Sequence, residues 1–158
     1  EDRSRANHAF FVSFAPYSHP EIAVTVNIPY GYAGTKELNE ALVSRFLVID
    51  MPAQTEESLE FIFRRMFPNI KENARTQFIG VFLDLQLKAT NSEISTKPLD
   101  LRGLLAAMKI VETGLSPRKA VTMGVVNKTF DIFEKEIVED IVKTRIPADW
   151  TRDDVYER

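Results

Sequence analysis

The pattern of apolar and polar residues in the first 28 positions differs from that in the rest of the chain. Residues 9–15 and 22–28 are short runs rich in β-branched and aromatic side chains. The segment 16–21 between them contains two prolines and has the composition of a turn. This pattern predicts a β-hairpin, or two neighbouring strands, at the start of the chain.

Between the hairpin and Pro52 the sequence predicts a loop, a short helix and one further strand. The loop, residues 29–34, holds two glycines and a proline, which interrupt a regular strand ladder. A polar helix is expected from about Lys36 to Ser44, and an apolar strand from Phe46 to Met51.

Beyond Pro52 the apolar residues recur at helical spacing. Thr55 is expected to cap the first helix, which ends at Pro68, and Asp100 to cap the third, which ends near Gly114. Ser116 and the proline after it are expected to open the fourth helix. The apolar faces are predicted to contain Leu59, Ile62, Phe63, Met66 and Phe67, then Ile70, Ala74, Phe78, Val81, Phe82 and Leu85, then Leu101, Leu104, Leu105, Met108 and Val111, and lastly Phe133, Ile137, Val138, Ile141 and Val142.

These patterns predict an α+β chain that is mainly α. Four parts are expected: the hairpin segment at residues 1–34, a helix and strand at 35–52, a packed helical bundle at 53–150 and a polar tail at 151–158. The phenylalanines of the helical part are expected in its core. The polar stretch 88–97 is expected to be a mobile loop, and Trp150 to hold the end of the chain on the bundle.

Composition excludes several classes of function. The 158 residues include 20 basic and 23 acidic side chains, a net charge of -3, with no basic cluster, which argues against a nucleic-acid partner. The absence of cysteine excludes a disulfide scaffold and a thiol nucleophile. His8 and His19 have no carboxylate cluster near them, so no metal site is expected. No run approaches the roughly 20 apolar residues of a membrane span. We therefore expect a cytoplasmic protein without a membrane partner, and a start at Glu1 suggests a piece of something longer.

One uninterrupted stretch carries a specific motif. A Gly-Tyr-Ala-Gly-Thr loop leads into a Leu-Asn-Glu-Ala-Leu helix and then to Ser-Arg-Phe, ahead of the apolar run 47–52. This stretch resembles the AAA+ ATPases of the MoxR, NorQ and CbbQ kind, and the helices after it look like the C-terminal lid of that family. The matching residues are Tyr30, Gly31, Tyr32, Ala33, Gly34, Thr35, Lys36, Glu37, Leu38, Asn39, Glu40, Ala41, Leu42, Val43, Ser44, Arg45 and Phe46.

The resemblance implies three roles. Arg45 would be an arginine finger that reaches the ATP site of a neighbouring copy, Asn27 the first sensor and Arg102 the second. Such groups suit phosphoryl transfer, because preorganised cations stabilise the charge on the γ-phosphoryl oxygens. The full-length protein would bind ATP and Mg²⁺, assemble into a ring of its own copies, a hexamer, and remodel or mature an unidentified client protein. In the family the asparagine is usually followed almost at once by the loop, whereas Ile28 and Pro29 intervene here.

Residues 7–33 also resemble another family. A Phe-Ala-Pro-Tyr turn followed by Pro-Glu-Ile-Ala-Val looks like the strands after the Lys-Thr-Gly motif of penicillin-binding protein transpeptidases. The Ser-x-Asn and Lys-Thr-Gly motifs of that family are missing. The two resemblances meet at residues 30–34, which suggests a composite sequence in which Asn27 belongs to the transpeptidase-like part.

The chain lacks the residues that would hold a nucleotide on their own. No Gly-x-x-x-x-Gly-Lys-Ser/Thr string is present, and Asp50 ends its strand without the second acidic residue of a Walker B motif. The chain alone is therefore expected not to hydrolyse ATP. If the resemblance is set aside, Arg45 could simply be a surface residue that pairs with Glu40 or Asp50. Arg102 could likewise be an exposed residue of its helix. A helical interaction module without catalysis is the third reading.

Overall fold

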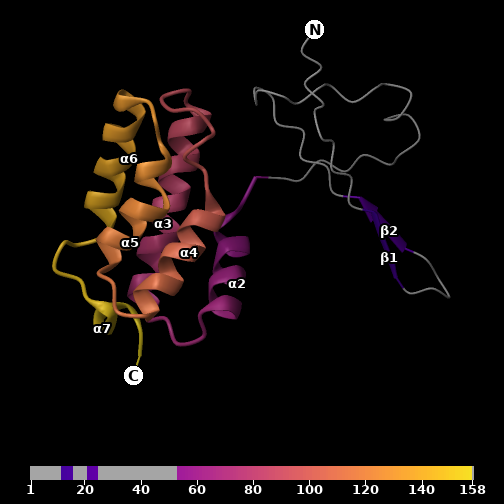
Figure 1. Ribbon diagram of the computed structural model, residues 1–158, viewed down its shortest axis with the longest axis horizontal. Coiled ribbons are helices and arrows are strands. Elements are labelled where there is room, and N and C mark those ends of the chain that lie inside the picture. The colour runs from indigo at the N-terminus through magenta and orange to yellow at the C-terminus, as the bar shows by residue number, and fades with distance from the viewer. Residues whose placement is uncertain (1–11, 16–20, 25–52, 158) are drawn as a thin grey trace, which may run out of the picture. The chain divides into compact units, whose positions relative to one another are not determined.

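The computed structural model describes the backbone of residues 12–15 and 21–24 and the structure of residues 53–157 (Figure 1). The chain divides into two units, residues 1–51 and 52–158. In the first, β1 (Val12–Ala15) and β2 (Glu21–Val24) pair antiparallel, with Val12 opposite Val24. The helix expected at 36–44, the strand expected at 46–51, and with them Asn27 and Arg45, lie outside the described residues.

The second unit is a helical bundle, so the chain is mainly α in its described part, as predicted (Figure 1). Helix α3 contacts α2, α4, α6 and α7 and so forms the centre of the bundle. The elements are α2 (Glu56–Met66), α3 (Glu72–Thr90), α4 (Leu101–Glu112), α5 (Pro117–Gly124), the 3₁₀ helix η1 (Val126–Lys128), α6 (Ile132–Arg145) and α7 (Arg152–Val155).

Side-chain caps define where the helices begin. Thr55 and Ser58 form a reciprocal capping box, in which the Thr55 hydroxyl accepts from the Ser58 N–H at 3.2 Å. Asp100 accepts from the N–H of Gly103 at 2.8 Å, which starts α4 as predicted. Each such cap satisfies a backbone donor that has no partner inside the helix. At the other end of α4, Gly114 has φ of 110°, the left-handed conformation expected there.

The core contains most of the predicted apolar positions, but three phenylalanines lie outside it. Phe63 and Phe78 are fully buried, whereas Phe61, Phe130 and Phe133 are 64%, 91% and 78% exposed. The prediction that the phenylalanines of the helical part are core is therefore wrong for these three. Periodicity identifies the apolar face of a helix, but burial also needs a neighbouring helix at the same height, and none covers the first turn of α6 within the described residues.

The polar stretch after α3 is tied to the bundle. Ile94 is 5% exposed and Pro98 is buried. The N–H and hydroxyl of Ser95 both donate to the carboxylate of Glu134 on α6, at 2.8 and 2.9 Å. Of the stretch 88–97, expected to be a mobile loop, residues 88–90 belong to α3. The rest is anchored by the buried side chain of Ile94, by Pro98 directly after it and by the two-point hydrogen bond of Ser95.

The end of the chain is also part of the fold. Thr151 caps the short helix α7, and after it Val155 and Tyr156 are buried, which overturns the prediction of a polar tail at 151–158. The Tyr156 hydroxyl donates to the carbonyl oxygen of Met108 at 3.0 Å. The N–H of Lys71 donates to the carbonyl oxygen of Val155 at 2.8 Å, so that the tail lies against the α2–α3 connection. Trp150 is partly buried against the core, as expected.

Candidate site at the start of helix α4

Arg102 is the one predicted site residue within the part of the chain that the structure describes. It is the second residue of α4 and is exposed to solvent. Its guanidinium makes no hydrogen bond or ion pair with another described residue. An arginine held on the first turn of a helix, with its cationic group unpaired, is placed to meet an anion outside the bundle.

Asp100, two residues before Arg102, joins α4 to the 3₁₀ helix η1. One carboxylate oxygen accepts from the Gly103 N–H at 2.8 Å, and the other contacts the Lys128 ammonium at 2.6 Å. Burial alone would raise the pKa of the Asp100 carboxyl, but the hydrogen bonds from Lys128 and from the Gly103 backbone together lower it. Asp100 is therefore ionised at neutral pH, and both of its oxygens are in use.

Two glycines allow α4 and α5 to approach closely beside this ion pair. A Cβ added to Gly103 would lie 2.2 Å from the carbonyl oxygen of Gly124, 2.5 Å from an Asp100 oxygen and 2.8 Å from the Lys128 nitrogen. A Cβ added to Gly124 would lie 2.5 Å from the carbonyl oxygen of Gly103. Real Cβ atoms do not come this close to backbone oxygens, so only glycine fits at both positions as they stand.

The electrostatics of this corner favour an anion. Arg102 and Lys128 contribute two positive charges against the one negative charge of Asp100, and all three lie at the positive end of the α4 dipole. The corner has no nucleophile or general base in hydrogen-bond reach among these groups. Its net positive charge suits an anionic ligand such as a phosphate.

Sequence reasoning found Arg102 but missed Lys128, Gly103 and Gly124. The available signal was a glycine in the first turn of one helix and another at the end of the next, because glycine inside a helix costs stability unless close packing requires it. Lys128 left no local signal, since its partner lies 28 residues earlier in the chain.

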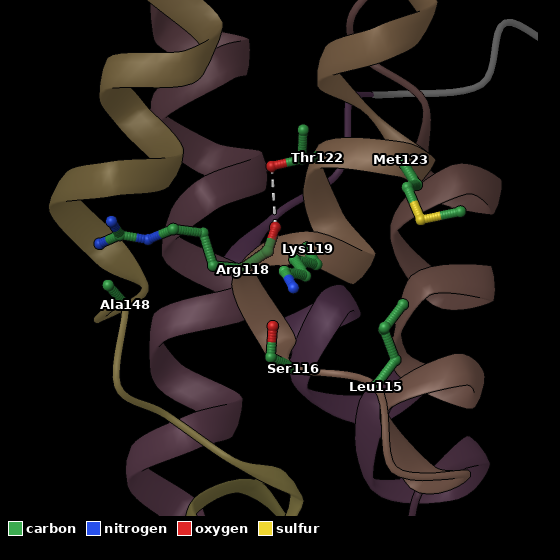
Figure 2. A pocket seen from close by; sticks show the side chains of 7 residues that line it. All are labelled: Leu115, Ser116, Arg118, Lys119, Thr122, Met123 and Ala148. Atoms are coloured by element: carbon green, nitrogen blue, oxygen red, sulfur yellow. Dashed lines mark hydrogen bonds between the residues drawn. The ribbon is translucent and has the colours of Figure 1, made fainter.

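A hollow of about 420 Å³ beside α5 is the next candidate (Figure 2). The guanidinium of Arg118, which lines this hollow, is already bonded to backbone carbonyl oxygens. It donates to the carbonyl oxygen of Ile146 at 2.9 and 2.6 Å and to that of Lys143 at 3.1 Å, and so caps the end of α6. Thr122 donates back to the Arg118 carbonyl oxygen at 2.8 Å. The hollow is lined by Leu115, Ser116, Arg118, Lys119, Thr122, Met123 and Ala148.

Two further ion pairs lie between helices. The Nε atom of Arg75, which is 7% exposed, lies 2.7 Å from a Glu60 oxygen, although its N–H is not directed at that oxygen. Arg145 on α6 donates to both carboxylate oxygens of Asp84 on α3, at 2.7 and 2.9 Å. The hydrogen bond to Asp84 raises the pKa of Arg145. Both pairs connect elements of the bundle and leave no group free for chemistry.

Within residues 53–157 and the described strands, no group of three or more His, Cys, Asp or Glu side chains lies close enough together to hold a metal ion. None of the helices described there combines the length and apolar character needed to cross a membrane.

The chain is similar to two bacterial proteins. It is 33% identical over 121 residues to the uncharacterized protein YojN of Bacillus subtilis (strain 168), which covers 77% of this chain and 40% of YojN. It is 23% identical over 124 residues to the uncharacterized protein SH1500 of Staphylococcus haemolyticus (strain JCSC1435), covering 78% of this chain and 47% of SH1500. The chain thus spans less than half the length of these curated relatives. No protein-family profile matches the chain, and no solved structure does either.

The extent of the YojN match bears on how the chain is built. A matched stretch of 121 residues cannot be contained in residues 53–158 alone, so it also includes residues ahead of the helical bundle. The bundle and at least part of the segment before it therefore occur together in a natural protein.

Proposed function

We propose that this chain is the C-terminal part of a MoxR-like AAA+ ATPase, with the arginine-finger segment followed by the helical lid. The observation that carries the proposal is the uninterrupted motif of residues 30–46, which ends in Arg45-Phe46 and is followed directly by a helical bundle. Supporting it, the match to YojN extends across the boundary between these two parts.

The corner at the start of α4 fits the second-sensor role for Arg102. A lid that closes over ATP needs an exposed cation on a well-held element, because the γ-phosphoryl group gains its stabilisation from preorganised charge. Arg102 is exposed and unpaired within the described residues, and the turn that carries it is held by Asp100 and Gly103. Arg45 would act on the ATP of the neighbouring copy, and Asn27 would orient the attacking water.

The complete protein would supply what this chain lacks. ATP and Mg²⁺ would bind to a P-loop and a Walker B motif in the preceding part of the protein, in keeping with relatives more than twice the length of the matched stretch. The protein would form a ring, a hexamer, in the cytoplasm and use ATP hydrolysis to remodel or mature a client protein.

The test is steady-state ATP hydrolysis by the full-length protein and by three arginine variants. We expect Arg45→Ala and Arg102→Ala each to lower kcat by about 100-fold or more, because each removes a cation that acts on the transition state. Arg65→Ala is the matched control, since Arg65 is exposed on α2 and lies outside the corner. Activity of Arg45→Ala close to that of the unchanged protein would sink the finger assignment. A full-length protein without a P-loop would sink the whole proposal.

The transpeptidase-like segment makes a separate prediction. If residues 7–33 came from a functional penicillin-binding protein, the full-length protein would form a stable adduct with a labelled β-lactam. We expect no adduct, because the Ser-x-Asn and Lys-Thr-Gly motifs that accompany the acylated serine in that family are missing from these 158 residues. Labelling that survives denaturation would favour the transpeptidase over the ATPase.

A further inference from the structure

Lys128 lies where it can control Arg102 without touching a ligand itself. Its ammonium contacts one oxygen of Asp100 at 2.6 Å, and the other oxygen of Asp100 caps the turn that contains Arg102. Asp100 thus connects Lys128 to the backbone turn that carries the Arg102 guanidinium. The Lys128 side chain is half exposed, and among the described residues Asp100 is the only carboxylate it pairs with.

The same turn is held on a second side by backbone contact. Gly103 lies one residue after Arg102, and the space for its missing Cβ is occupied by the Gly124 carbonyl oxygen, the Asp100 carboxylate and the Lys128 ammonium. Gly124 ends α5, and η1 with Lys128 follows it directly. The first turn of α4 is therefore fixed to the α5–η1 corner by one ion pair and one helix–helix contact.

A position held from two sides matters for an arginine that must meet a phosphate. A guanidinium offers its donors in a rigid planar fork, so small displacements of its backbone misalign both donors at once. Reacting groups that are misplaced by about 1 Å can lose about 100-fold in rate. By contrast, the surface ion pair between Lys128 and Asp100 should contribute little to the stability of the bundle, because exposed pairs are screened by solvent.

We propose that Lys128 is a positioning residue for Arg102: through Asp100 it sets where the Arg102 guanidinium is presented to the phosphates of ATP. This inference rests on the proposed function of Arg102 as the second sensor. Lys128 acts through the backbone turn of α4 and needs no contact with the nucleotide. Asp100 has the same positioning role, because it joins Lys128 to that turn.

The experiment compares ATP hydrolysis by the full-length protein with and without Lys128, in two backgrounds. We expect Lys128→Met to lower kcat by about three- to fivefold, and to change the KM for ATP less than about twofold, because it displaces a group without removing it and acts through an exposed ion pair. In an Arg102→Ala background the same substitution should have no further effect. Lys128→Arg, which can still reach Asp100, should retain most of the activity.

Two comparisons separate positioning from a general loss of structure. Lys109→Met makes the same chemical change at an exposed position on α4 and should leave kcat unchanged. The thermal unfolding midpoint of Lys128→Met should stay within about 3 °C of the unchanged protein, because an exposed ion pair is screened by solvent and contributes little to stability. Asp100→Asn keeps a good capping residue and should match Lys128→Met, with no added loss in the double variant.

The outcomes distinguish this inference from the function it rests on. If Arg102→Ala is fully active, the second-sensor role itself is wrong. If Arg102→Ala is impaired but Lys128→Met is fully active, the positioning role is overturned while the proposed function stands. The same holds if Lys128→Met lowers kcat by the same factor in the Arg102→Ala background as in the unchanged protein.

Discussion

Replacing Gly103 by alanine should destabilise the bundle, and the sign of the effect is the informative quantity. In an ordinary helix interior, alanine is more favourable than glycine by about 1 kcal/mol, so the substitution would stabilise the chain. Here the new methyl group would lie 2.2 Å from the Gly124 carbonyl oxygen, which belongs to the backbone and cannot rotate away. The helices would have to separate.

The expected size follows from these two opposing effects. Inserting a methyl group into a well-packed contact typically costs about 1–3 kcal/mol. Subtracting the gain in helix propensity of about 1 kcal/mol leaves a net loss of up to about 2 kcal/mol, in addition to any loss from displacing Asp100 or Lys128. Urea unfolding of the 158-residue chain, followed by helical circular dichroism, should show this as a midpoint lowered by up to roughly 1 M.

Two further variants calibrate the result. Ala106→Gly, at an exposed position of the same helix, measures helix propensity alone and should cost about 1 kcal/mol. Gly124→Ala fills the same contact from the other side. The double variant should therefore lose less stability than the sum of the losses of the two single variants. A rise in stability for Gly103→Ala equal to the loss for Ala106→Gly would refute the close approach of α4 and α5.

Three further experiments, with five substitutions between them, test the packing described here. Phe133→Ser should change the free energy of unfolding by less than about 0.5 kcal/mol because the ring is exposed, whereas Phe78→Ala should lose about 3–5 kcal/mol; comparable losses in urea unfolding would contradict the assigned exposure. Tyr156→Phe should lose about 1 kcal/mol at pH 7, with the hydroxyl bond to Met108. Burial raises the pKa of Tyr156 above its ordinary 10.0, so as the pH rises the phenol ionises first in the unfolded chain. The stability that this group contributes therefore falls as the pH rises past 10.0. The difference in free energy of unfolding between the unchanged protein and Tyr156→Phe, measured in urea, should shrink between pH 7 and about pH 10.5. Asp84→Asn and Arg145→Met should each destabilise the chain, with a coupling energy of about 0.5–3 kcal/mol in a double-mutant cycle, and additive losses would show that the pair at 2.7 Å does not contribute as a unit.

Features set by neighbouring residues were predictable from the sequence. The caps at Thr55 and Asp100, the left-handed Gly114 and the proline at the start of α5 each depend on side chains within a few residues of the backbone they act on. The amphipathic stripes likewise identified Phe63 and Phe78 as core. Such signals are local, so they survive without knowledge of how the helices pack.

Features set by distant partners were not predictable. Phe133 has the spacing of a core residue but is 78% exposed. Tyr156 lies in a polar segment but is buried, with its ring near that of Phe67 and its hydroxyl bonded to Met108 on α4. Arg102 could be placed through its resemblance to a family, whereas Lys128 and the Gly103–Gly124 contact depend on the packing of α4 against α5. Periodicity and composition contain no information about which helices become neighbours.

The burial of residues 155 and 156 has a consequence for how this protein is made. The backbone N–H of Lys71 donates to the carbonyl oxygen of Val155, and that of Glu157 to the carbonyl oxygen of Asn69. These bonds join segments about as far apart as Lys71 and Asp153, whose own side-chain bond spans 82 positions. Helices α2 to α5 can form local contacts while the chain is still being synthesised, but the corner beside Phe67 stays uncovered until the tail has left the ribosome. A nascent chain stalled before residue 151 would therefore present that corner to chaperones and proteases, and synthesis of residues 151–157 would allow it to close.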